Sequence, residues 1–188
     1  KRVTFMVQGL MLGLALILIV LSVSIGVILK DVAFLTFPVY VLFAVLGLGL
    51  NHGTTQMLVW PDSPELVLVW GGTIFGFHIC FAGLFFTTFL QLREHLNWLH
   101  RMIVFSSVTA AFLGLVYGLF PTLGEEAILY IMVVILLPGV VVAACWRAWH
   151  GYKPAMILVA AFIPMATGSL IQSAALAGWI EFSSLYFY

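Results

Sequence analysis

Charged residues are scarce in this chain. Only 7% of its 188 residues are Asp, Glu, Lys or Arg, whereas about a quarter of the residues of a soluble globular domain are charged. The hydrophobic fraction is 64% and the mean hydropathy is +1.20. So few charges cannot cover a surface that faces water on all sides. The composition therefore predicts an integral membrane protein.

Net charge and cysteine are also nearly absent. Seven Lys and Arg residues balance seven Asp and Glu residues, which excludes both a basic nucleic-acid-binding surface and an acidic disordered tail. The two cysteines, Cys80 and Cys145, fit neither a disulfide framework nor a zinc module. We therefore expect no nucleic-acid partner and no zinc site.

Six long apolar runs, separated by charged loops, are present instead. Because about 20 apolar residues cross the hydrocarbon core of a bilayer, they predict six complete membrane spans. These cover residues 3–29, 32–50, 66–90, 102–120, 127–146 and 154–177, and a seventh begins at about residue 183 without being completed. The first run is too long for the apolar region of a signal peptide. The fold class is an all-α, multi-pass helical bundle that forms one domain over residues 1–188.

Three of these runs contain a proline: Pro38, Pro138 and Pro164. Membrane helices tolerate proline where a neighbouring helix supplies a donor to the carbonyl that proline leaves free. Because the chain begins with Lys1 and not with Met, we also expect it to be a fragment or a mature product of something longer.

Alternate loops differ in charge. One set holds five cations and two anions, and the other holds two cations and five anions. The cations of the first set are Lys30, Arg93, Arg101, Arg147 and Lys153. Loops rich in Lys and Arg stay in the cytoplasm. The distribution therefore predicts that the first set is cytoplasmic and that the N-terminus lies outside.

The five histidines do not form a haem or metal site by pattern. A b-type haem in a helix bundle needs two axial histidines at matching depth, and only His78 lies at mid-span. His52 lies at an outer helix end, and His95, His100 and His150 lie at the cytoplasmic side. A membrane redox or haem subunit is therefore the weakest alternative. His78 is still a candidate functional residue, because a polar residue at mid-span is expected to face the bundle interior.

No carboxylate or lysine lies in the middle of the predicted spans. A proton or ion pump usually needs one there, and a retinal protein needs a lysine inside the bundle. The lysines Lys1, Lys30 and Lys153 all lie at helix ends. A transporter or channel subunit remains the main alternative, although the chain lacks the clear internal repeat of many transporters.

Glycines four residues apart occur in three spans, and such small faces let helix backbones approach closely. The pairs are Gly9 and Gly13, Gly72 and Gly76, and Gly114 and Gly118. Each is a candidate helix contact, within the chain or between two copies.

The loop between the second and third spans is the most specific segment. Asp62 or Ser63 can cap the third helix, as in any ordered return into the membrane. The nearby outer residues His52, Gln56 and Trp60 are, with His78, our candidate contacts for a ligand or for an upstream domain.

Several motifs, in order, resemble a known family. They are Gly9 and Gly13 in the first span, Lys30–Leu35 at a tight turn, Trp60–Pro64, Phe89–Leu90 before a basic loop, and Arg147–Ala155 entering the sixth span. The ordered set resembles the transmembrane domain of bacterial seven-transmembrane receptors with diverse intracellular signalling modules (7TMR-DISM).

The resemblance implies a function for the whole chain. It implies a sensor module in the bacterial inner membrane, with an extracytoplasmic sensor domain upstream. A cytoplasmic output domain, such as a histidine kinase or a diguanylate cyclase, would follow downstream. It further implies a homodimer, because such outputs often act in pairs. The domain itself would be no enzyme and would need no cofactor.

Overall fold

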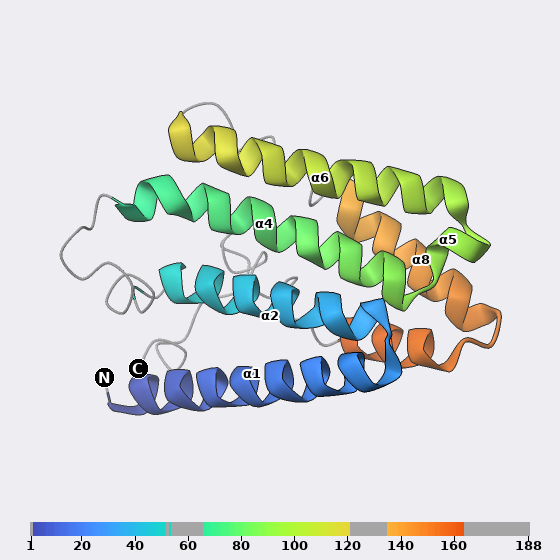
Figure 1. Ribbon diagram of the computed structural model, residues 1–188, viewed down its shortest axis with the longest axis horizontal. Helices are drawn as coiled ribbons and strands as arrows, with labels where there is room; N and C mark the ends of the chain where they lie inside the picture. Colours follow the sequence, from blue (N-terminus) through green and yellow to red (C-terminus); the bar gives the residue numbers. More distant parts are fainter. Residues whose placement is uncertain (1, 52, 54–65, 121–134, 164–188) are drawn as a thin grey trace, which may run out of the picture. The chain divides into compact units, whose positions relative to one another are not determined.

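The computed structural model describes residues 2–51, 53, 66–120 and 135–163, and all regular structure among them is helical (Figure 1). The helices are α1 (Arg2–Leu29), α2 (Val32–Asn51), α4 (Leu66–Phe89), α5 (Leu92–His95), α6 (Asn97–Leu119) and α8 (Leu137–Trp149), followed by a helix over Lys153–Ile163. The chain divides into two compact units. One is Leu12–Ala143, and the other joins Lys1–Met11 with Ala144–Tyr188.

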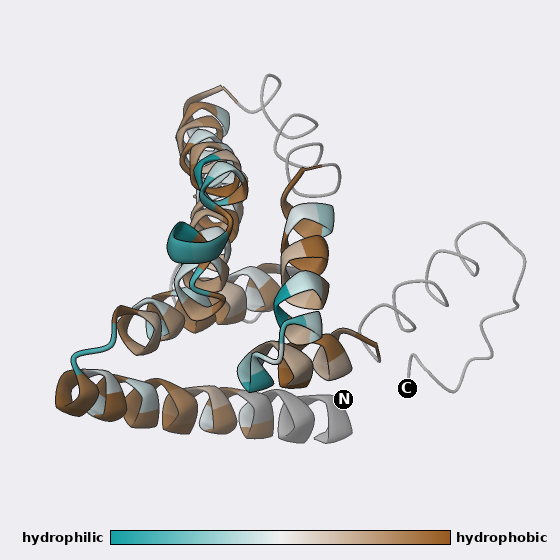
Figure 2. Cartoon of the chain, turned by 90° about the vertical axis from the view of Figure 1, so that its right-hand side faces the viewer, coloured by the Kyte–Doolittle hydropathy of each residue, from teal (hydrophilic) through white to brown (hydrophobic). Residues whose placement is uncertain are grey.

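Four of the described helices are long and apolar enough to cross a membrane. The apolar stretches are Leu12–Leu29, Val32–Leu50, Trp70–Phe89 and Asn97–Leu119. Figure 2 shows hydrophilic residues gathered at turns and hydrophobic residues along the helices. Helices α1, α2 and α4 begin and end within about one residue of the predicted spans.

The fourth predicted span, residues 102–120, needs a correction. Helix α6 begins at Asn97, five residues earlier, and ends at Leu119. Asn97, His100 and Arg101 are polar and precede the predicted span, but they form the first turns of the helix. Polar side chains at a helix end can reach the membrane interface. Polarity alone therefore places the start of α6 too late in the sequence.

The last predicted spans are described only in part. Among the described residues, α8 covers the end of the fifth run and continues to Trp149, and the helix Lys153–Ile163 covers the first part of the sixth run. The described parts of both are shorter than a membrane span. The remaining parts of these runs and the start of the seventh helix lie outside the described residues. The structure thus supports four spans of the six predicted.

The turn between α1 and α2 is built by Lys30 and Asp31. Lys30 has the left-handed conformation, with φ of 54°, and the Asp31 N–H donates to the Gly26 carbonyl at 3.3 Å. The Asp31 carboxylate then accepts a hydrogen bond of 2.8 Å from the Ala33 N–H, which caps α2. The motif that suggested a tight turn therefore reverses the chain in two residues.

Helices α2 and α4 pack antiparallel through aromatic rings. Phe37, near the start of α2, lies 5.1 Å from Phe85, near the end of α4. Farther along α2, Phe43 lies 5.4 Å from Phe77 and 5.5 Å from Phe81. This pairing brings the α1–α2 turn and the α4–α6 turn to the same end of the Leu12–Ala143 unit (Figure 1).

Helices α4 and α6 approach backbone to backbone. A Cβ added to Gly76 would lie 2.8 Å from the Gly114 Cα, and one added to Gly114 would lie 2.9 Å from the Gly76 Cα. The Thr73 hydroxyl also donates to the Gly114 carbonyl at 3.1 Å. Two of the three small-residue pairs thus serve a helix contact inside the chain. A Cβ at Gly9 or Gly13 would meet no described atom within 4 Å.

The turn after α8 belongs to the other unit. Gly151 has φ of +82°, its N–H donates to the Ala148 carbonyl at 3.0 Å, and the Tyr152 N–H donates to the Arg147 carbonyl at 3.0 Å. These are the two hydrogen bonds of a Schellman helix end. The Arg147 guanidinium carbon lies 4.2 Å above the centre of the Tyr152 ring, so the side chains close the turn as well.

Candidate functional site

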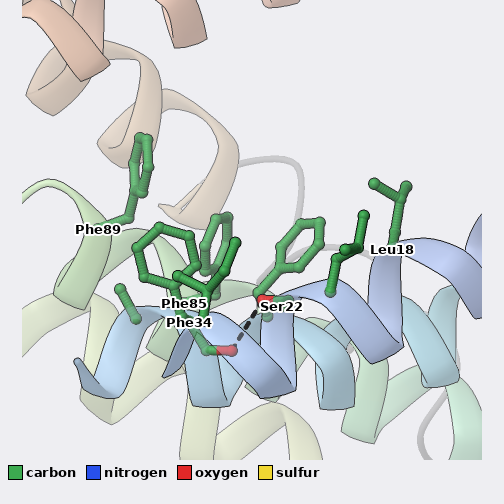
Figure 3. Close-up of a pocket in the computed structure, with 9 residues that line it drawn as sticks. Leu18, Ser22, Phe34, Phe85 and Phe89 are labelled. Atoms are coloured by element: carbon green, nitrogen blue, oxygen red, sulfur yellow. Dashed lines mark hydrogen bonds between the residues drawn. The ribbon is translucent and has the colours of Figure 1, made fainter. Parts of the chain in front are cut away.

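Pro38 lies inside α2 and leaves one carbonyl of this helix without its helical donor. Proline has no N–H, so the carbonyl of Phe34, four residues earlier, receives no bond from position 38. The Ser22 hydroxyl of α1 donates to that carbonyl at 2.8 Å (Figure 3). The prediction that a neighbouring helix satisfies the freed group is confirmed at Pro38. The carbonyl four residues before Pro138, and Pro164 itself, lie outside the described residues.

A pocket of about 310 Å³ adjoins this hydrogen bond. Helices α1, α2 and α4 line it with nine residues: Leu18, Leu21, Ser22, Ile25, Ala33, Phe34, Phe37, Phe85 and Phe89. Figure 3 shows Phe34 and Phe85 close to the Ser22–Phe34 bond, which α1 and α2 share. Ser22 brings the only hydroxyl to this lining, and that hydroxyl is already bonded. The pocket is therefore suited to an apolar occupant.

The pocket lies at membrane depth. Ser22 precedes the Lys30 turn by eight residues, which corresponds to about 12 Å along a helix at roughly 1.5 Å per residue. A hydrocarbon core is about 30 Å thick. In a bilayer crossed by the candidate span Leu12–Leu29, the pocket would therefore lie within the apolar layer, in the half of the unit that ends at the α1–α2 and α4–α6 turns.

His78 lies in the middle of α4 and packs against α2. Its ring stacks on the Tyr40 ring with centroids 5.2 Å apart and planes 22° apart. The Nδ1 atom is buried without a hydrogen-bond partner among the described residues. His78 does not line the pocket, but Tyr40 also stacks on Phe85 at 5.8 Å. The His78–Tyr40 pair therefore reaches the pocket wall through one ring.

The other predicted contact residues are not brought together with His78. His52, Gln56 and Trp60 lie outside the described residues, as does the proposed cap at Asp62 or Ser63. Within the described ranges, no group of three or more His, Cys, Asp or Glu residues could hold a metal ion. The Nδ1 atoms of His95 and His150 lie 3.2 Å and 2.8 Å from the carbonyls of the residues four positions earlier. These two histidines therefore act as local helix contacts.

Sequence reasoning missed Ser22, Tyr40 and the pocket. The sequence did contain a signal for Ser22. Pro38 leaves the Phe34 carbonyl in need of a donor, and Ser22 carries a hydroxyl on α1, the helix that a two-residue turn joins to α2. Tyr40 carried no comparable signal, since its stacking on His78 depends on how α2 and α4 are aligned.

Comparison with known proteins gives one match. A family model described as 7TM diverse intracellular signalling matches residues 4–188, a range that contains every residue of the pocket and of the His78–Tyr40 pair. No curated protein and no solved structure matches the chain significantly.

Proposed function

The chain belongs to the 7TM diverse intracellular signalling family, and we propose that it relays an extracytoplasmic signal to a cytoplasmic output domain. The family match covers nearly the whole chain, and this observation carries the proposal. It makes the chain a transmembrane sensor module of a signalling protein, not itself catalytic. The output that we propose is a histidine kinase, a diguanylate cyclase or a similar domain.

The distribution of charge supports the proposed orientation. Lys30 lies on the α1–α2 turn, Arg93 lies in α5 and Arg101 lies in the first turns of α6, and these segments share one end of the Leu12–Ala143 unit (Figure 1). The positive-inside rule assigns that end to the cytoplasm. The start of α1 would then face outward, toward an upstream sensor domain. We place the module in the bacterial inner membrane as a homodimer.

The packing suggests which parts move. Backbone contacts at Gly76 and Gly114 tie α4 to α6, and such close contacts resist sliding because backbone atoms cannot yield. Helix α2 contains Pro38 and meets α4 through aromatic rings. A signal at the outer ends of α1 and α2 would therefore be passed on by a shift of these helices over the α4–α6 pair. Such relay requires two states with different affinity for the signal.

The full-length receptor in native membranes provides the test. Output activity is measured with and without the upstream domain, and with His52, Gln56 or Trp60 replaced by alanine. We expect the deletion to abolish the response to signal and the outer substitutions to weaken it. Output that ignores the deletion and all three substitutions would reduce the bundle to an anchor and overturn the proposal.

A further inference from the structure

The pocket beside the Ser22–Phe34 hydrogen bond has no assigned occupant. We propose that it takes one acyl chain of a phospholipid from the surrounding bilayer, and that this chain helps to hold α1 against α2 and α4. The proposal concerns binding and does not depend on signal relay.

The chemistry of the lining selects a hydrocarbon. Its side chains are aliphatic or aromatic except that of Ser22, and the Ser22 hydroxyl already donates to the Phe34 carbonyl. A ligand with several polar groups would lose its hydration there, and among the lining side chains only the Ser22 oxygen could accept a hydrogen bond from it. An alkyl chain loses nothing of this kind.

The volume of the pocket agrees with one chain. About 310 Å³ corresponds to roughly ten water molecules at about 30 Å³ each, and hence to an alkyl segment of about ten methylene groups. The small side chain of Ala33, which is only 7% exposed, lies in the wall and leaves this room.

The α1 side of the pocket is partly exposed. Leu18, Leu21 and Ile25 form its α1 side and are 48%, 53% and 38% exposed. They belong to the span Leu12–Leu29, whose exposed side is in contact with lipid when the helix crosses a bilayer. Phospholipid tails are the most concentrated hydrocarbon at that depth.

Charge at the end of α1 favours a phospholipid over a free hydrocarbon. Lys30 is exposed at the α1–α2 turn, about 12 Å along the helix from Ser22 at roughly 1.5 Å per residue. A lipid with its phosphate at the level of Lys30 can therefore extend its tail into the pocket. The cation and the phosphate attract each other in this arrangement.

Photolabelling tests the proposal on the full-length protein. The protein is placed in vesicles of phosphatidylethanolamine and phosphatidylglycerol that contain a phosphatidylcholine with a diazirine in the middle of one acyl chain. After irradiation, labelled peptides are mapped by mass spectrometry. We expect label to concentrate on the α2 and α4 walls of the pocket, at Phe34–Phe37 and Phe85–Phe89.

Two neighbouring substitutions separate pocket binding from general lipid contact. Leu18→Trp places a large ring at the opening, whereas Ile17→Trp makes the same change at a residue of similar exposure, 56%, that does not line the pocket. We expect Leu18→Trp to reduce wall labelling about fivefold or more, because the indole fills the space, and Ile17→Trp to leave it nearly unchanged. Leu21→Trp with Val20→Trp is the second pair if Leu18→Trp does not fold.

Four results would overturn the proposal. One is equal wall labelling in both members of a pair. A second is wall labelling no stronger than that of the exposed α1 residues Val20 and Val27. A third is a set of crosslinks, in protein without the lipid probe, that shows another part of the chain filling the pocket. The fourth is loss of label on adding a small amount of free fatty acid, which would identify a different ligand. None of these measurements reads the signalling output.

Discussion

The Ser22 hydroxyl of α1 donates a hydrogen bond of 2.8 Å to the Phe34 carbonyl of α2. This carbonyl is the one that Pro38 leaves without a helical donor. Ser22 is only 6% exposed, so water does not readily replace it. One hydroxyl therefore satisfies the carbonyl that Pro38 leaves free and joins the first two helices of the bundle.

Replacing Ser22 should weaken the bundle, and Pro38 should control the size of the effect. We expect Ser22→Ala to lower the free energy of unfolding by about 1 kcal/mol, a typical value for one hydrogen bond. In a Pro38→Ala background the restored N–H can bond the Phe34 carbonyl, so the same change should cost clearly less. Unfolding of the four proteins in lipid bicelles gives the coupling free energy.

Ser24→Ala is the matched control for this cycle. The Ser24 hydroxyl is exposed and bonds the Val20 carbonyl of its own helix at 2.8 Å. Its removal should change the stability little in either background. An equal cost for Ser22→Ala with and without Pro38 would contradict the assigned role of the hydrogen bond.

The contact between Gly76 and Gly114 should be intolerant of a single methyl group. A Cβ at Gly76 would lie 2.6 Å from the Ala110 carbonyl oxygen and 2.8 Å from the Gly114 Cα, and both are backbone atoms. We expect Gly76→Ala to cost about 1–3 kcal/mol through overpacking. Gly71→Ala on the same helix meets no described atom within 4 Å and should be neutral or stabilising. Thermal unfolding measures the stability of both variants. Equal stabilities of Gly76→Ala and Gly71→Ala would contradict the close contact between α4 and α6.

The sequence predicted the first three helices well because their limits are charged or turn-forming residues. Lys30 and Asp31 end one apolar run and start the next, and the structure turns at these two residues. The start of α6 was missed because Asn97, His100 and Arg101 look like a loop by composition. A helix continues through such residues where they reach the membrane interface, and hydropathy does not record this.

The candidate site was less predictable, because it depends on alignment between helices. His78 was singled out as a polar residue at mid-span, but its stacking on Tyr40 follows from the pairing of Phe37 with Phe85 and Phe43 with Phe77. A single sequence does not show how α2 and α4 are aligned along each other. The pocket likewise requires three helices to be placed before its walls exist.

The stacking of Tyr40 on His78 should give a measurable coupling free energy of unfolding. Aromatic pairs are worth about 0.5–1.5 kcal/mol beyond the area they bury. We expect Tyr40→Leu and His78→Leu together to cost less than the sum of the single changes, by about that amount. His78→Phe keeps the ring and should retain most of the coupling. Additive effects of the two leucine substitutions would show that the rings do not stabilise each other.

The turn after α8 should require glycine at position 151. Its φ of +82° is unfavourable for residues with a Cβ, at a cost of about 1–2 kcal/mol. Gly151→Ala should therefore destabilise the protein by about that amount, and Gly151→Asn by less, since Asn adopts left-handed conformations more readily. Unfolding in bicelles compares the variants. A neutral Gly151→Ala would contradict the Schellman geometry.

The two ends of α6 should lie on opposite sides of the membrane. Asn97 at its start and Phe120 just after its end are both exposed, and the helix between them is long and apolar enough to cross a bilayer. In a background with Cys80 and Cys145 replaced by alanine, single cysteines are introduced as Asn97→Cys and Phe120→Cys. They are treated with a membrane-impermeant maleimide in intact cells and in inverted vesicles.

Because Arg93 and Arg101 flank Asn97, the positive-inside rule places this end of α6 in the cytoplasm. Asn97→Cys should therefore react only in inverted vesicles, and Phe120→Cys only in intact cells. The reverse pattern would invert the topology and place the proposed output domain outside the cell, whereas labelling of both sites from one side would show that α6 does not span the membrane.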